Sequence, residues 1–389
     1  MAWLMAGLVP GSQVLGRISF AMAGKPLAVV EVPLKDPSMV VRGTEPYNAG
    51  PPLESLRASL LTPVPLFFVR NHGTVPLVDA AVYRLTVTGL VDRELQLSLA
   101  ALQREFTPST VTATIQCAGN RRRELNAVRS IEGEIPWDAE AVGTATWTGV
   151  PLGAVLQAAG VRALGRYVHL LGLDTVATDT QGFGGSIPLE KAMSPEVLLA
   201  YEMNGSPLLP VHGFPLRVVV PGYIGARSVK WLRSISVAAE PSRNYFQSHA
   251  YKWFPPHVLA QTVDWTAGLT LTEPPVSAVI CTPREGQRVQ GGHLTTTGYA
   301  FAGGGRQIAR VEVSADGGMQ WEPAQLVGEA HAWTWRFWEA HLRLPPGRRP
   351  IVVRAEDSAG AGQPPEPASV WNFKGYVNNA WHRVTVEVD

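Results

Sequence analysis

Short apolar runs separated by turns set the pattern of the first two thirds of the chain. Residues 83–90 alternate apolar and polar positions and end in a glycine, which predicts a half-buried strand. Residues 109–116 are rich in Thr and Val, the residue types that favour strands. Residues 97–106 and 151–159 are instead predicted as short helices, and Gly160 is a typical C-cap for the second.

Strands and helices do not alternate regularly in this part of the chain. Residues 167–171 and 216–220 are predicted as buried strands. The absence of regular βα units favours a mixed α+β fold over a doubly wound α/β fold. We assign this fold to a domain spanning residues 41–268. Residues 1–40 have no clear period and are expected to form an N-terminal leader or extension.

The pattern changes after about residue 273, where short strands follow one another with Gly, Pro and Asp turns between them. The predicted strands are 277–280, 294–300, 308–314, 333–338 and 351–355. Such regular spacing predicts an immunoglobulin-like β-sandwich over residues 269–389, without the Cys…Trp…Cys pattern of antibody domains.

Composition and charge exclude several classes of protein. Of the 389 residues, 46% are hydrophobic and 17% charged, which is typical of a globular protein with large cores. The formal net charge of +1 gives no global field that would attract a nucleic acid or an acidic membrane. No apolar run reaches the ~18 residues that a membrane span needs. Anion selectivity must therefore come from local clusters.

The compartment is only weakly indicated. Ala21-Met22-Ala23 resembles a signal cleavage site, but no basic segment precedes it. A cytoplasmic location is therefore favoured, and a periplasmic one stays open.

Two cysteines, Cys117 and Cys281, rule out a disulfide framework and a CxxC metal site. Their surroundings differ, which argues against one disulfide between them. Cys117 ends a β-rich run and is followed by Ala118, Gly119 and three arginines. Small neighbours leave room beside the sulfur, and nearby cations favour the thiolate, the form that binds a soft metal. A lone cysteine more often acts as a small buried apolar residue, and we expect that role for Cys281.

The segment Cys117-Ala118-Gly119-Asn120-Arg121-Arg122, with Glu124 beyond it, resembles the cofactor-cysteine signature of the sulfite oxidase family, which includes assimilatory nitrate reductases. The resemblance covers roughly residues 60–389. It implies that the Cys117 thiolate coordinates molybdenum and that one molybdopterin supplies two further sulfur ligands.

Phe68-Val69-Arg70-Asn71-His72 is similar to a second family segment. The resemblance implies that Arg70 binds the oxyanion substrate and that Phe68, Arg70 and His72 border the pterin. Taken alone, the segment could be a surface turn.

A glycine-rich turn with basic residues follows the predicted strand 216–220. Its backbone amides and cations could hold a phosphate, although a solvated tight turn would have the same composition. In the family this stretch binds the pterin and its phosphate, and Asp174 falls where a further pterin contact is expected. The implied cofactor residues are Asp174, His212, Arg217, Gly225, Arg227, Ser228 and Lys230.

Two positions bear on the substrate. Tyr251-Lys252 resembles the Tyr-Lys pair of sulfite oxidases, which have the tyrosine in the active site, whereas nitrate reductases usually carry asparagine there. Trp371-Asn372-Phe373-Lys374-Gly375 resembles the Trp-Asn-x-Arg-Gly string of the animal enzymes. Lys374 takes the position of their substrate-binding arginine. Lysine keeps the charge but loses the planar two-pronged hydrogen-bonding group.

The resemblance implies that sulfite binds among Arg70, Arg122, Tyr251 and Lys374 and leaves as sulfate after oxygen-atom transfer. The electrons would pass to an external acceptor, a cytochrome or oxygen. A homodimer through the sandwich is expected, and six tryptophans there agree with an interface. The alternatives are nitrate reduction, other sulfur-compound or S-oxide chemistry on the same fold, and a binding module without metal.

Overall fold

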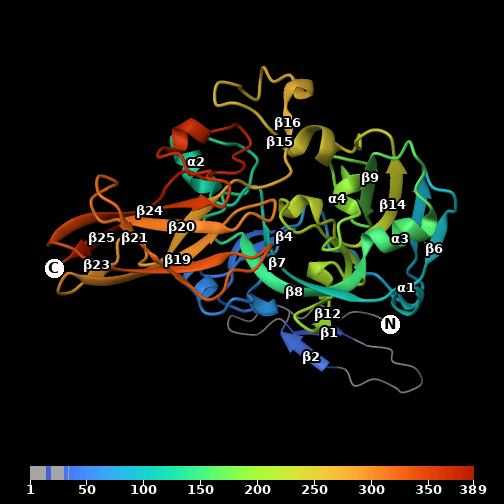
Figure 1. Ribbon diagram of the computed structural model, residues 1–389, viewed down its shortest axis with the longest axis horizontal. Helices are drawn as coiled ribbons and strands as arrows, with labels where there is room; N and C mark the ends of the chain where they lie inside the picture. Colours follow the sequence, from blue (N-terminus) through green and yellow to red (C-terminus); the bar gives the residue numbers. More distant parts are fainter. Residues whose placement is uncertain (1–14, 19–29, 34) are drawn as a thin grey trace.

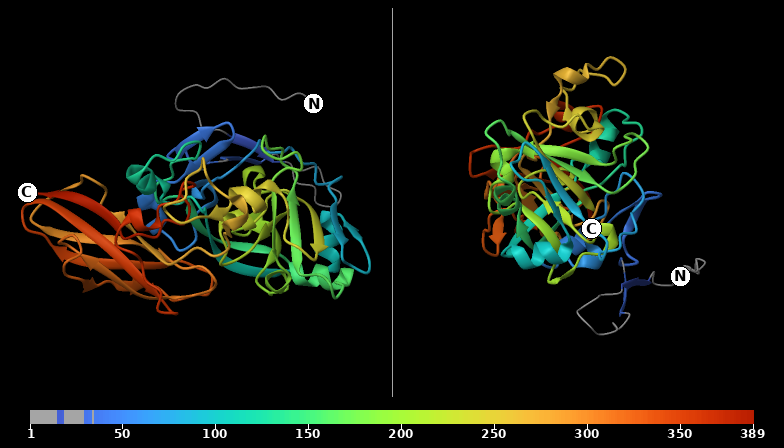
Figure 2. Two further views of the ribbon diagram at one scale, coloured as in Figure 1. Left: turned by 90° about the horizontal axis from the view of Figure 1, so that it is seen from above. Right: turned by 90° about the vertical axis from the view of Figure 1, so that its right-hand side faces the viewer.

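Two bodies of different build lie side by side in the computed structural model, which describes residues 15–18, 30–33 and 35–389 (Figure 1). The first is mixed, with sheets and short helices, and the second is strand-rich. A turned view shows the strand-rich body, in orange and red, extending from one end of the mixed body (Figure 2). The α+β prediction followed by a sandwich is confirmed in this order along the chain.

The mixed body contains two five-stranded sheets. The first has the order β10-β9-β14-β5-β6, with strands Gly184–Pro188, Tyr167–Gly172, Leu232–Ala238, Leu85–Gly89 and Leu95–Leu97. The second has the order β12-β11-β8-β7, with β13 also paired to β11; its strands are Ser206–Pro207, Leu198–Met203, Val142–Pro151, Ser109–Gln116 and Arg217–Val219. One apolar cluster packs Val87 and Ile235 of the first sheet with Leu199 of the second, so the sheets share a core.

Four short α-helices accompany these sheets in the described part of the chain: α1 Leu99–Glu105, α2 Arg122–Val128, α3 Leu152–Ala159 and α4 Leu189–Ala192. The Ser98 side chain caps α1 by accepting the Ala101 N–H, and Gly160 ends α3 at a φ of +74°. The helices predicted at 97–106 and 151–159 are confirmed. Helix α2 was not predicted.

The strand-rich body is a sandwich of two sheets. One has the order β17-β19-β23-β22, with strands Ser277–Thr282, His293–Phe301, Arg336–Arg343 and Gln325–Val327. The other has the order β18-β25-β24-β20-β21, with strands Arg288–Val289, His382–Val388, Gly347–Asp357, Ile308–Ser314 and Glu322–Pro323. Trp338 and Ile351 are buried between the sheets, which gives the predicted sandwich its core.

The strand predicted at 333–338 is displaced, because β23 begins only at Arg336. Trp333 has a φ of +68°, outside strand geometry, and its carbonyl accepts the Thr114 N–H at 2.8 Å. Its ring packs so close to Gly222 and Gly305 that a Cβ on either glycine would lie 2.9 Å from it. Trp333 therefore joins the two bodies. Trp335 is buried at the same junction, so tryptophan content alone does not argue for a dimer interface.

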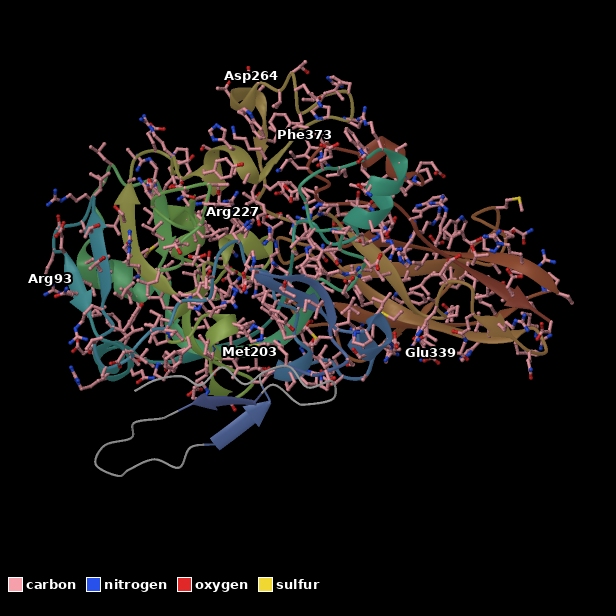
Figure 3. The ribbon with its side chains drawn as sticks, turned by 180° about the vertical axis from the view of Figure 1, so that it is seen from behind. Arg93, Met203, Arg227, Asp264, Glu339 and Phe373 are labelled. Atoms are coloured by element: carbon pink, nitrogen blue, oxygen red, sulfur yellow. The ribbon has the colours of Figure 1, made fainter. Side chains whose placement is uncertain are left out.

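Among the described residues, three two-stranded hairpins complete the fold: β1 Leu15–Ile18 with β2 Val30–Pro33, β3 Val40–Thr44 with β4 Tyr47–Gly50, and β15 Lys252–Trp253 with β16 Leu269–Thr270. The loop between β15 and β16 projects from the molecule and carries Asp264, with Phe373 below it (Figure 3). The cleavage-like segment 21–23 lies outside the described residues. Where the structure is described, no helix is long and apolar enough to cross a membrane.

Candidate active site

An open cavity gathers side chains from seven separate stretches of the sequence. Its lining is Phe67, Phe68, Arg70, Asn71, His72, Ile115, Cys117, Ala118, Asp174, Phe183, His212, Arg217, Gly225, Ala226, Ser228, Lys230, Trp231 and Tyr251. Most residues that the sequence singled out therefore meet in one place. Arg122, Arg227 and Lys374 are not part of this lining.

Cys117 stands where β7 leaves its sheet. Its backbone N–H donates to the Ala141 carbonyl at 2.9 Å, and its Sγ accepts the Gly119 N–H at 3.4 Å. The sequence suggested that small residues leave room beside this sulfur. The space at Gly119 is in fact filled by Arg122, since a Cβ there would lie 2.5 Å from the guanidinium. Ala118 does line the cavity. Both cysteines are unbridged, and burial raises the pKa of the Cys281 thiol to about 12.

Arg70, His72 and Tyr251 form a hydrogen-bonded chain along the cavity. Arg70 Nη2 lies 3.1 Å from His72 Nδ1, and His72 Nε2 lies 2.7 Å from Tyr251 Oη. Burial lowers the pKa of His72 well below its usual range, and the neighbouring Arg70 charge lowers it further. The imidazole is therefore neutral, and a guanidinium can only donate. It follows that Nδ1 accepts from Arg70 and Nε2–H donates to Tyr251, which leaves the phenol proton for another acceptor.

Basic residues dominate the other end of the cavity. Arg217 donates to the carbonyls of His212 at 3.0 Å and Ser228 at 3.1 Å, and Lys230 donates to the Val211 carbonyl at 2.9 Å and to Asn71 Oδ1. Burial lowers the pKa of Lys230 well below its usual range and that of Arg217 to about 9. Such cations are poorly solvated without a matching negative charge.

Asp174 is the acid in this lining, and burial raises the pKa of its carboxyl to about 6 despite the opposing Lys230 charge. One of its buried oxygens, Oδ1, has no hydrogen-bond partner. A bound group with an anionic end for the cations and a donor for Asp174 would satisfy both features. A phosphorylated pterin has both, so the residues present fit molybdopterin.

Lys35 lies behind this basic end of the cavity. No sequence pattern indicated Lys35, because it lies inside the expected leader. Its ammonium donates to the carbonyls of Val64 at 2.8 Å and Phe67 at 2.6 Å and to His212 Nε2 at 2.7 Å. Burial lowers the pKa of Lys35 well below its usual range. Lys35 therefore holds the His212 imidazole from outside the cavity lining.

Arg122 borders the site from behind Gly119. Its Nε donates to the Lys374 carbonyl at 3.0 Å and its Nη1 to the Ile135 carbonyl at 2.7 Å. Its guanidinium lies over the ring of Tyr376, with Cζ 5.1 Å from the centroid. That ring stacks on Tyr251, with centroids 5.3 Å apart. Arg122 is thus fixed beside the Cys117 turn and next to the tyrosine of the cavity.

Arg227, labelled in Figure 3, is buried in the mixed body. It is not part of the cavity lining. Its Nε and Nη2 donate to the Leu271 carbonyl at 3.0 and 2.9 Å, and its Nη1 donates to Gln247 Oε1. These bonds tie the turn of Gly225 and Ser228 to neighbouring segments. The geometry gives Arg227 a supporting position rather than a direct contact with a bound group.

Comparisons with known proteins agree with this geometry. Residues 72–246 match the oxidoreductase molybdopterin binding domain, and residues 269–389 match the Mo-co oxidoreductase dimerisation domain. The mitochondrial sulfite oxidase of Homo sapiens is 45% identical over 367 residues, which are 92% of this chain and 67% of that protein. The sulfite oxidase of Arabidopsis thaliana is 41% identical over 378 residues, 92% of this chain and 95% of that protein.

The crystal structure of the sulfane dehydrogenase SoxCD from Paracoccus pantotrophus superposes with a TM-score of 0.75 at 26% identity, covering 98% of this chain and 93% of that one. The shared fold therefore extends along nearly the whole chain. On these grounds the chain belongs to the sulfite oxidase family of molybdopterin-binding oxidoreductases.

Proposed function

We propose that this protein oxidises sulfite to sulfate at a molybdenum cofactor. The observation that carries the proposal is one cavity in which the Cys117 thiol, the Arg70 guanidinium and the Tyr251 phenol meet. A thiolate can ligate a soft metal, and a guanidinium can bind an oxyanion through paired hydrogen bonds. A phenol can donate a hydrogen bond to the oxygen atom that is transferred. The activity agrees with the names of the Homo sapiens and Arabidopsis thaliana relatives.

The cofactor would be held from two sides. Cys117 would ligate molybdenum, and the pterin and its phosphate would contact the residues of the basic end and their neighbours: Phe68, Arg70, His72, Asp174, His212, Arg217, Gly225, Ser228 and Lys230. Arg227 would act indirectly, through the turn that it braces. The bound molybdenum cofactor supplies the two-electron oxygen-atom transfer that the protein alone cannot perform.

The protein's own part is to bind and orient the substrate. Arg70 and Arg122 would hold two oxygens of sulfite, and Lys374 would add a point charge. Since His72 donates to Tyr251 Oη, the phenol proton is available for an oxygen of the substrate or product. Burial raises the pKa of Tyr251, so it stays a donor at neutral pH. Tyr251-Lys252 favours sulfite over nitrate as the substrate.

The partners follow from the same assignment. Electrons would leave to an external acceptor, a cytochrome or oxygen. Residues 41–268 would form the catalytic domain and residues 269–389 the dimerisation domain of a homodimer, as the dimerisation-domain match supports. We favour the cytoplasm over the periplasm as the compartment.

The test is metal analysis combined with steady-state assays on the purified protein. Sulfite and nitrate are compared as substrates, with ferricyanide, cytochrome c and oxygen as electron acceptors. We expect about one molybdenum per chain and sulfite-dependent reduction of an acceptor. Protein that contains molybdenum but turns over only nitrate would overturn the substrate assignment, and protein that binds no molybdenum would overturn the function.

A further inference from the structure

The loop after α2 brings an acidic side chain to the cations expected to bind the substrate. The Arg121 N–H donates to the Asp138 carbonyl at 2.7 Å and the Arg123 N–H to the Trp137 carbonyl at 2.9 Å, so the loop returns alongside its own helix. This path places Glu134 beside Lys374 and Arg122. Neither the family signature nor the spacing of residues pointed to Glu134.

Glu134 pairs with both cations at once. Its Oε1 contacts the Lys374 ammonium, and its Oε2 lies 3.4 Å from Arg122 Nη2. The side chains of Glu134, Lys374 and Arg122 are only 12%, 18% and 3% exposed, so solvent screens these charges weakly. The carboxylate therefore occupies donors that an oxyanion would otherwise use.

Arg122 does not depend on Glu134 for its position. Two backbone carbonyls hold its Nε and Nη1, and Gly375 lies so close that a Cβ there would be 2.5 Å from the Arg122 Cγ. Lys374 has a flexible stem, and the contact that fixes its ammonium is the one to Glu134. Glu134 thus restrains Lys374 more than it restrains Arg122.

The negative charge of Glu134 acts on a tyrosine that packs against the active site. Burial raises the pKa of Tyr376 well above its usual range, and the Glu134 carboxylate raises it further. Tyr376 stacks on Tyr251, which lines the cavity. A negative charge that acts on these tyrosines will also repel a dianion bound next to them.

We propose that Glu134 sets the anion affinity of the site by competing with the substrate and product oxyanions for Lys374 and Arg122. This inference rests on the proposed function, because it takes the two cations as the sulfite subsite. Binding of sulfite or sulfate then requires the Lys374 ammonium to be shared with, or released from, Glu134. The carboxylate weakens the binding of both anions and speeds the release of sulfate.

The experiment compares Glu134→Gln with Glu132→Gln in the cofactor-loaded protein. Glu132 lies two residues away on the same loop and is exposed, so its substitution changes the net charge equally without removing the contact to Lys374. We expect Glu134→Gln to bind sulfate roughly tenfold more tightly by calorimetry and to lower the KM for sulfite by a similar factor. Glu134→Asp keeps the charge and should stay near the native values.

A double substitution separates the charge of Glu134 from a structural role. If Glu134 acts on Lys374, the gain in sulfate affinity from Glu134→Gln should shrink when Lys374→Met is also present. Equal sulfate affinity in the native protein, Glu134→Gln and Glu132→Gln would overturn the inference, as would weaker binding in Glu134→Gln. Sulfate calorimetry does not depend on turnover. A protein that fails to oxidise sulfite but shows the affinity change would refute only the proposed function.

Discussion

His72 Nε2 lies 2.7 Å from Tyr251 Oη, while His72 Nδ1 faces the Arg70 guanidinium at 3.1 Å. Because the guanidinium has only donors, this pair of contacts fixes which imidazole nitrogen carries the proton. In the proposed complex, the imidazole that orients the Tyr251 phenol would also contact the pterin. One side chain would then link cofactor binding to the orientation of the substrate.

Replacing Tyr251 by Phe removes the donor at the end of this chain and leaves the His72 N–H without its acceptor. We expect kcat/KM for sulfite to fall about tenfold to a hundredfold, as for the loss of a hydrogen bond to a charged group. Steady-state kinetics at saturating and limiting sulfite measure the change. Tyr83→Phe is the control, since Tyr83 Oη donates to the Leu232 carbonyl in the core that the two sheets of the mixed body share. Equal kinetics in both variants would contradict a role for Tyr251.

Cys117→Ser and Cys281→Ser should separate metal binding from packing. Cys117 opens to the cavity, so its serine variant should fold and lose molybdenum-dependent sulfite oxidation. Cys281 is buried in an apolar cluster, where a serine hydroxyl would cost about 1–3 kcal/mol of stability. Cys281→Ser should therefore keep its molybdenum content and activity, measured by metal analysis and assay, with a lower melting temperature. Full activity in Cys117→Ser would remove the basis of the metal assignment.

Local elements of the mixed body, including the strand before Cys117, were predicted well from the sequence. The predicted strand 109–116 is β7, Ser109–Gln116, and Gly160 caps α3 as expected. These segments have strong local signals, because β-branched runs and a C-terminal glycine leave few alternative conformations. Most of the residues that the family motifs indicated also line one cavity, whereas Arg122, Arg227 and Lys374 lie outside its lining.

Contacts between side chains far apart in the sequence could not be predicted. Lys35 reaches His212 across 177 residues, and Glu134 reaches Lys374 from a loop with no distinctive composition. Arg227, which the motif suggested as a direct contact, instead bonds to the Leu271 carbonyl. The partner of each of these side chains depends on which distant segment the fold brings next to it. Neither the hydrophobic periodicity nor the spacing of motifs carries that information.

Asp174 should make the stability of the cofactor-free protein depend on pH. Burial raises the pKa of its carboxyl from 3.8 to about 6, so the folded state holds the proton more tightly than the unfolded chain does. The contribution of this group to the unfolding free energy is present below pH ~4 and is lost as pH rises through ~6, by about 3 kcal/mol at most. Asp174→Asn should abolish this loss in urea unfolding between these pH values.

Asp92→Asn is the matched control for that experiment, because the Asp92 side chain is 74% exposed. Its pH profile should follow that of the native protein. An Asp174→Asn profile that also follows the native one would show that Asp174 does not titrate in this range.

The sandwich should mediate a homodimer. The match of residues 269–389 to a dimerisation domain supports this assembly, while Trp338 is buried within the single chain and gives no support to it. Light scattering of the purified protein at micromolar concentration should give a mass twice the 42.0 kDa of one chain. A mass of one chain at that concentration would contradict the prediction.

Lys374 should contribute to sulfite binding as a point charge. Lys374→Arg should lower the KM for sulfite, because a guanidinium offers two parallel hydrogen bonds to an oxyanion. Lys374→Ala should raise KM more than it lowers kcat, with a loss of about tenfold to a hundredfold in kcat/KM.

Lys191→Ala is the matched control for Lys374→Ala. Lys191 pairs with Glu196 at 2.6 Å, and the two side chains are 13% and 14% exposed, close to the 18% and 12% of Lys374 and Glu134. Each substitution breaks a largely buried ion pair and should lower stability, but only the loss of Lys374 should change the KM. If sulfite kinetics are unchanged in Lys374→Arg and Lys374→Ala, the Lys374 ammonium pairs with Glu134 and takes no part in sulfite binding. Arg70 and Arg122 then remain as the anion-binding pair, because Arg122 keeps its two backbone acceptors without Lys374's side chain.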